Sequence, residues 1–204
     1  MAYEIALNLA WDNLSRLDLK EVAGRSEGDL KDNRLTVDFL KEKFIVDPAK
    51  HQVFFNKLEI KAKDFIAVLI LHYLIGVKDL PLAGEKISFK DLPGGDFYFP
   101  AFRQSCLMPL INGFSNRPQA LAEQAKYLNG EVVSLGDNAV EVKPFGRLPL
   151  TVVVWGKDSE FSAEANVLYD ATAKEFLPTE DIVVVTNLTV AKLVSKHGIV
   201  SLKK

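Results

Sequence analysis

The residues best suited to bind a ligand lie between Gly94 and Arg103. Gly94-Gly95-Asp96 stands just before a segment that we expect to be helical. Glycines let a backbone approach a ligand closely, and the first turn of a helix offers unpaired amides to an anion. The pattern is neither a Walker loop nor a dinucleotide-binding fingerprint. The alternative is a tight turn in which Asp96 caps the helix.

Arg103 follows within the same expected helix, with Phe99 and Phe102 close to it in the sequence. Its guanidinium has a planar fork of donors that matches a carboxylate or a phosphate. Arg103 is therefore a candidate contact for an anion. The alternative is a structural ion pair within the protein. The carboxylates considered for that pair are those of Asp91, Asp96 and Glu180.

Two further segments carry side chains capable of acid–base chemistry. His72 lies late in a strongly apolar segment, and metal binding or proton transfer there would need partners that the sequence does not place near it. The alternative is a core histidine bonded to a carbonyl near a helix end. Thr179-Glu180-Asp181 offers two carboxylates for acid–base work. Acidic residues also suit the first turn of any helix, so helix capping is the alternative there.

The composition of the chain excludes several classes of protein. A single cysteine, Cys106, allows no intrachain disulfide and no cluster ligated by four thiolates. The net charge of -2 gives no basic field for unspecific nucleic-acid binding. The apolar runs are too short to span a bilayer, and the N-terminus lacks the pattern of a signal peptide. We therefore expect a cytoplasmic protein that binds neither nucleic acid nor membrane.

The first half of the chain predicts a three-stranded meander between helices. An amphipathic helix is expected over residues 3–23, with a break within 13–18. Alternating and apolar runs predict strands over residues 35–39, 44–46 and 53–55. A helix that is apolar on nearly all sides is expected over residues 62–75. Gly76 suits the left-handed position that often ends a helix.

The second half of the chain predicts two helices, four strands and a last helix. The first helix begins near Asp96 and is ended or bent at Pro109, and the second covers residues 118–128. The strands are expected over residues 131–135, 139–143, 148–155 and 161–169. The last helix runs to about Lys196, with Thr179 capping its first turn. The fold class is therefore α+β, with antiparallel β-meanders and packed helices.

A similarity between the two halves predicts an internal duplication. Asp32-Asn33 precedes an alternating strand in the first half, and Asp137-Asn138 precedes one in the second. Both halves then have the order helix, strands, helix. We expect one domain, 1–204, with repeated parts 1–76 and 117–204 and a unique linker 77–116. The alternative is chance similarity of composition and turn chemistry.

Several motifs along the chain share a pattern with a known family. Before residue 104 they are Leu71-His-Tyr-Leu-Ile-Gly76, Pro81-Leu-Ala-Gly84, Ile87-Ser-Phe-Lys-Asp-Leu-Pro-Gly-Gly95 and Ala101-Phe-Arg103. Beyond it they are Leu135-Gly-Asp137, Ser162-Ala-Glu-Ala-Asn-Val-Leu-Tyr-Asp170 and Leu177-Pro-Thr-Glu-Asp181. From about Trp11 to Leu193 the chain resembles an uncharacterised domain-of-unknown-function family of anaerobic bacteria and archaea. Some relatives in it are fused to a Cys-rich iron–sulfur domain of the kind found near corrinoid proteins. The resemblance implies no established reaction and no catalytic residue.

We expect a non-catalytic protein that binds a small anionic molecule or cofactor of anaerobic metabolism. The predicted site residues are Gly94, Gly95, Arg103, His72, Tyr98 and Glu180. The sequence leaves the identity of the ligand, any cofactor and the oligomeric state open.

Two alternative functions remain. The first is an accessory module that contacts a redox or corrinoid enzyme through an exposed apolar patch, with Phe97, Tyr98 and Phe99 as candidates. The second is an enzyme using Arg103, His72 and Glu180, which requires these three side chains to converge in one cleft.

Overall fold

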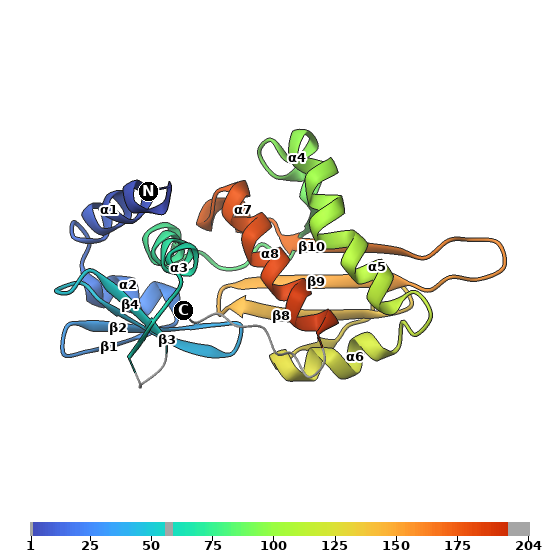
Figure 1. Ribbon diagram of the computed structural model, residues 1–204, viewed down its shortest axis with the longest axis horizontal. Coiled ribbons are helices and arrows are strands. Elements are labelled where there is room, and N and C mark those ends of the chain that lie inside the picture. The colour runs from blue at the N-terminus through green and yellow to red at the C-terminus, as the bar shows by residue number, and fades with distance from the viewer. Residues whose placement is uncertain (1, 56–58, 196–204) are drawn as a thin grey trace.

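The computed structural model describes residues 2–55 and 59–195, and it consists of two lobes lying side by side (Figure 1). Each lobe contains a five-stranded antiparallel sheet and helices packed on it, which confirms the predicted α+β class with β-meanders. We call residues 2–76 the N-terminal lobe and residues 77–195 the C-terminal lobe. The predicted helix end at Lys196 lies outside the described residues.

The N-terminal lobe begins with two helices, α1 (Ala2–Leu14) and α2 (Leu19–Ser26). The sequence predicted one helix with a break at this point, and the break is confirmed. Asp18 causes it by capping α2, because its carboxylate accepts hydrogen bonds from the amides of Lys20 and Glu21 at 2.7 and 3.1 Å.

The first sheet is a meander whose strands pair in the order of the chain. The strands are β1 (Asp29–Lys31), β2 (Arg34–Phe39), β3 (Glu42–Asp47), β4 (Gln52–Phe55) and β5 (Ile60–Lys61). Two-residue turns join the first three strands, and both residues of each turn have positive φ: Asp32 and Asn33 in one, Leu40 and Lys41 in the other. The three predicted strands are confirmed, while β1 and β5 are short edge strands that the pattern did not predict.

Helix α3 (Asp64–Gly76) is the buried helix that the sequence predicted. The predicted role of Gly76 was wrong, because this residue keeps a helical conformation. A Cβ atom there would lie 2.2 Å from the backbone oxygen of Phe176, in α7 (Ala173–Phe176). Gly76 is therefore required by the close approach of the C-terminal lobe.

The second sheet has the strand order β6-β10-β9-β8-β7. Its strands are β6 (Lys86–Ser88), β7 (Glu131–Val132), β8 (Ala139–Phe145), β9 (Leu148–Trp155) and β10 (Glu164–Asp170). β7 to β10 form the predicted meander. β6 comes from the segment 77–116 that the sequence described as a linker, and it pairs with β10. That segment is thus part of the C-terminal lobe.

A long helical stretch crosses the second sheet beside α8 (Thr179–Val194) (Figure 1). It consists of α4 (Gly95–Phe102), a π-helical turn (Arg103–Leu107) and α5 (Met108–Phe114). In the widened turn the amide of Met108 donates to the oxygen of Arg103, five residues back. Pro109 follows at once, so the wide turn accommodates the residue that was predicted to end or bend this helix. The shorter α6 (Ala120–Ala125) packs on β8.

The two lobes share one hydrophobic core. Phe145 of β8 stacks on Tyr73 of α3 with ring centroids 3.9 Å apart, and on Phe39 of β2 at 4.6 Å. The amide of Leu40 donates to the oxygen of Pro144 at 2.8 Å, which joins the two sheets end to end. Each lobe carries a long helix after its last strand, α3 and α8, and the internal duplication stays a prediction.

Candidate functional site

A histidine–aspartate pair joins the two lobes at the start of α8. Nδ1 of His72, on α3, lies 2.6 Å from Oδ2 of Asp181, on α8, and the residues are 109 positions apart in the chain. The His72 side chain is 34% exposed and that of Asp181 is 14% exposed. The ring is therefore held on one edge and reachable from solvent. Because Nδ1 is bound to Asp181, Nε2 is the ring nitrogen that can face a ligand.

The partner of His72 controls its charge. The hydrogen bond that His72 donates to Asp181 raises the pKa of His72, burial of the ring opposes this shift, and the Asp181 charge adds to it. At a given pH the imidazolium form is thus more populated than in a free histidine, and in that form Nε2–H is a charged donor. One interpretation of the sequence was a core histidine bonded to a backbone carbonyl. In the structure the partner of His72 is instead a carboxylate from the other lobe.

The first turn of α8 has no side-chain cap. Pro178 occupies the N-cap position, and Thr179 is the first helical residue, so the predicted capping role of Thr179 was wrong. The Thr179 hydroxyl donates instead to the oxygen of Pro93 at 2.8 Å. This bond places the turn that contains Gly94 next to the start of α8.

The glycine pair lies in the tight turn that begins α4. Gly94 occupies the N-cap position with φ +70°. A residue with a Cβ atom would adopt this backbone conformation only with strain. Gly95 is buried, and a Cβ atom there would lie 2.0 Å from the oxygen of Phe89. Its amide donates to the oxygen of Leu92 at 2.8 Å. The amide of Gly95 is thus already used within the turn, and Asp96 lies inside the helix, one residue beyond Gly95.

Arg103 lies exposed on the π-helical turn. Within residues 2–55 and 59–195, its guanidinium forms no ion pair with the carboxylates considered as structural partners. Asp91 accepts bonds from the amide and hydroxyl of Ser88 instead. Arg103 is therefore free of these structural pairs and accessible to a ligand.

Tyr98 and Phe97 form an exposed aromatic pair, which we call the α4 tip. Their rings meet edge to face at 5.2 Å and 85°. Phe97 is 83% exposed and Tyr98 is 39% exposed. Phe99 is partly covered, because the ammonium of Lys90 lies 4.4 Å from its ring centroid. Two of the three candidates for an apolar contact patch are thus open to solvent.

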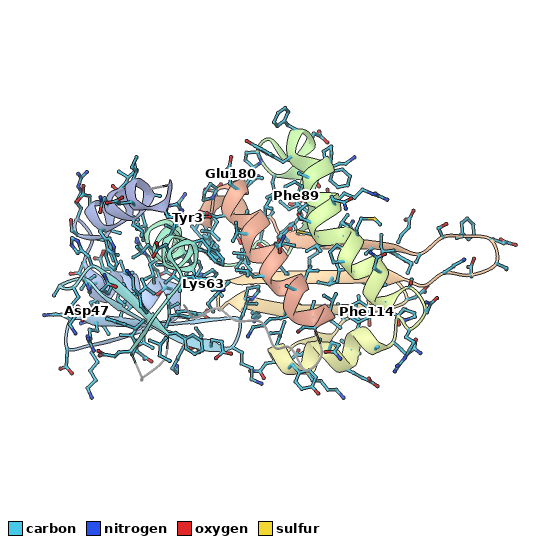
Figure 2. All side chains as sticks on the ribbon, in the orientation of Figure 1. Tyr3, Asp47, Lys63, Phe89, Phe114 and Glu180 are labelled. Atoms are coloured by element: carbon cyan, nitrogen blue, oxygen red, sulfur yellow. The ribbon has the colours of Figure 1, made fainter. Side chains whose placement is uncertain are left out.

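Glu180 is exposed on the first turn of α8, at the end of that helix nearest α4 (Figure 2). The structure therefore brings together His72, the start of α8 and the Gly94 turn. Asp181, which bonds to His72, is the candidate site residue that the sequence did not single out, since Glu180 was chosen from the same motif. No local signal reveals the choice, because it depends on how α3 and α8 pack. Among the described residues no cluster of His, Cys, Asp and Glu could hold a metal ion.

Comparison with known proteins places the chain in a family. A family model described as Domain of unknown function (DUF3786) matches residues 18–192. The chain belongs to the DUF3786 family. The match confirms the resemblance to an uncharacterised family and covers every predicted site residue of this DUF3786 chain. No curated protein and no solved structure matches it. Over the described part of the chain, each helix is too short or too polar to cross a bilayer.

Proposed function

We propose that this DUF3786 protein is a non-catalytic binding protein for a small anionic molecule, with its site beside the start of α8. The observation that carries the proposal is the bond of 2.6 Å between His72 and Asp181, with the His72 ring partly exposed. A protonated imidazole held on one edge by a carboxylate is a fixed, charged donor on the other edge. Small carboxylates and phosphates are hydrogen-bond acceptors of the opposite charge.

The surroundings of His72 support an anionic ligand. α8 is 16 residues long and lacks a side-chain cap. The amides of Asp181 and Ile182 already donate to the oxygen of Pro178, so the positive end of the helix dipole is what favours an anion there. Arg103 lies on the π-helical turn, which packs on α8, and we include it as a second contact. A role in anaerobic metabolism, and a link to corrinoid enzymes, form part of this proposal.

A thermal-shift screen tests the proposal directly. The panel contains inorganic phosphate, nucleotides, small carboxylates and corrinoids, and the proteins are wild type, His72→Gln and Arg103→Ala. A ligand at about 100 times its dissociation constant adds roughly 2.7 kcal/mol, which raises the melting temperature by about 2–4 °C at this size. We expect an anion to stabilise wild type and to lose its effect in His72→Gln.

The matched control is His51→Gln. His51 stacks on Trp11 in the N-terminal lobe, with ring planes 6° apart, and lies away from α8. This variant should respond to the ligand like wild type. Equal shifts in wild type and His72→Gln, or no shift with any anion, would contradict the proposed site.

The α4 tip favours a second candidate function, contact with a protein partner. A side chain like Phe97, 83% exposed, leaves apolar surface that a partner could cover. Capture of one defined partner by wild type, lost in Phe97→Ser and kept in Phe161→Ser, would favour this function. Equal capture by both variants would rule out the α4 tip as the contact.

A further inference from the structure

A hollow lies in the C-terminal lobe, where β9 leads into β10 through the long loop at the right of Figure 1. Its volume is about 440 Å³. Besides Gly156 and Ser162, it is lined by aromatic and acidic residues: Trp155, Phe161, Asp137, Asp158 and Glu164. Neither His72 nor Asp181 lines it, so the hollow is distinct from the proposed anion site.

The aromatic side chains of this hollow are unusually open. Phe161 is 69% exposed and Trp155 is 36% exposed. Neither ring stacks on another aromatic ring within the described part of the chain. Aromatic faces attract cations through their negative quadrupole, with Trp the strongest. Two open rings beside one hollow therefore offer contact area that suits a cationic ligand.

The three carboxylates give the hollow one sign of charge. Glu164 lies directly opposite Trp155 in the β9–β10 ladder, so the two side chains share one face of the sheet. The amides of Phe161 and Glu160 donate to Asp158 and lower its pKa, which keeps this carboxyl ionised. Among the described residues, no Lys or Arg side chain forms an ion pair with Asp137, Asp158 or Glu164.

The spacing of these carboxylates decides between a metal ion and an organic cation. A metal ion requires several ligand atoms within about 2.0–2.6 Å of one point. The described residues contain no group of three His, Cys, Asp or Glu close enough for that. A larger cation that fills the hollow can instead meet carboxylates on several sides and the aromatic faces together.

We propose that the hollow between Trp155, Phe161 and Glu164 binds a small organic ammonium ion. Trp155 and Phe161 contact its alkyl groups, and the three carboxylates balance its charge. This inference is independent of the anion site, because the two share no residue. It requires no chemical reaction, only binding.

The walls of the hollow are held in place before any ligand arrives. Gly136, with φ +63°, packs against the Trp155 indole, where a Cβ atom would lie 3.3 Å from Nε1. The amide of Lys157 donates to the oxygen of Ser115 at 3.1 Å, and that of Asp158 to the oxygen of Phe161 at 3.1 Å. A preformed site loses less conformational entropy on binding.

Titration of the full chain with choline tests the proposal, with 3,3-dimethylbutan-1-ol as its uncharged isostere. Binding is measured by calorimetry and by tryptophan fluorescence, and Trp155→Phe identifies which of the two tryptophans responds. We expect choline to bind wild type, with Glu164→Gln and the uncharged isostere each weaker by about fivefold or more. Glu123→Gln, an exposed carboxylate on α6, should bind like wild type.

Three outcomes would overturn the ammonium site. They are equal affinity for choline and its isostere, undiminished affinity in Glu164→Gln, and no binding of choline or spermidine at millimolar concentration. Circular dichroism of Glu164→Gln checks that the variant is folded. Glu164 is exposed, and its side chain forms no hydrogen bond or ion pair with the described residues, so the substitution should not unfold the protein.

Discussion

The two lobes differ in how far along the chain their strands find partners. In the N-terminal lobe each strand pairs with the next one, from β1 to β5. In the C-terminal lobe the edge strand β6 pairs with β10, so that Ser88 lies opposite Leu168. The first sheet therefore depends on turns and alternation, which are local. The second depends on a strand held by contacts from distant parts of the chain.

Two helix glycines, Gly24 in the N-terminal lobe and Gly95 in the C-terminal lobe, differ in how closely other atoms approach them. Gly24 of α2 has no atom within 4 Å of the position of a Cβ. Gly95 begins α4 and would place a Cβ 2.0 Å from the oxygen of Phe89. Glycine is thus replaceable in the first helix pair and obligatory where the C-terminal lobe brings backbones together.

Alanine substitutions at Gly95 and Gly24 should give the largest contrast. Gly95→Ala forces backbone against backbone and should lower the free energy of unfolding by about 2–4 kcal/mol. Gly24→Ala should raise it by roughly 0.5–1 kcal/mol, because Gly is a poor helix former. Urea unfolding measures both changes in the free energy of unfolding, provided that the m-value stays the same. Equal effects of the two substitutions would contradict the close approach at Gly95.

Asp170 sharpens the comparison, because it holds the long segment before β6 against the end of β10. It accepts bonds from the amides of Ala83, Gly84 and Thr172 and from the Thr172 hydroxyl, and it is 4% exposed. Asp170→Asn replaces an ionised acceptor and should cost about 1–3 kcal/mol. Asp38→Asn, in an exposed pair with Lys43, should cost at most about 0.5 kcal/mol.

The effect of Asp170→Asn should depend on pH. Burial raises the pKa of Asp170, but the bonds from Thr172, Ala83 and Gly84 outweigh it and leave the pKa lowered. A lowered folded-state pKa gives stability that is present above the unfolded value and lost as the pH falls. The difference between wild type and variant should thus shrink on acidification toward pH about 3. A difference that grows there would contradict this assignment.

Loss of the His72–Asp181 pair, which spans the two lobes, should have a smaller effect than loss of the Asp170 bonds. The pKa of His72 is raised, so its contribution is complete below the unfolded value of 6.5 and is lost as the pH rises through the folded value. Asp181→Asn should cost about 0.5–1 kcal/mol at pH 6, because the ring is partly exposed, and less at pH 9. Melting curves across this range measure it, and a cost that increases with pH would contradict the pairing.

Local signals in the sequence were sufficient for most of the fold. The alternation around Val37 predicted β2, and the β-branched run Thr151-Val-Val-Val154 predicted β9. These patterns report on residues that are close in the chain. The role of Gly76 was mistaken because Phe176, which excludes a side chain there, lies 100 positions away.

The candidate site depended more on distant contacts and was predicted less completely. His72 and the motif 179–181 were both recognised, yet the carboxylate chosen was Glu180 instead of Asp181. Adjacent residues on a helix point in different directions, and only the packing of α8 against α3 selects between them. Thr179 was assigned to a cap because its bond to Pro93 joins segments that the sequence cannot align.

The stack of Tyr73 on Phe145 has a consequence for synthesis on the ribosome. Strands and helices of the N-terminal lobe are complete by residue 76, but the ring that covers Tyr73 and Phe39 is supplied by β8. A nascent chain that has not yet reached Phe145 leaves these apolar rings uncovered. We therefore expect chaperones to shield the N-terminal lobe during translation until the β8–β9 hairpin has emerged.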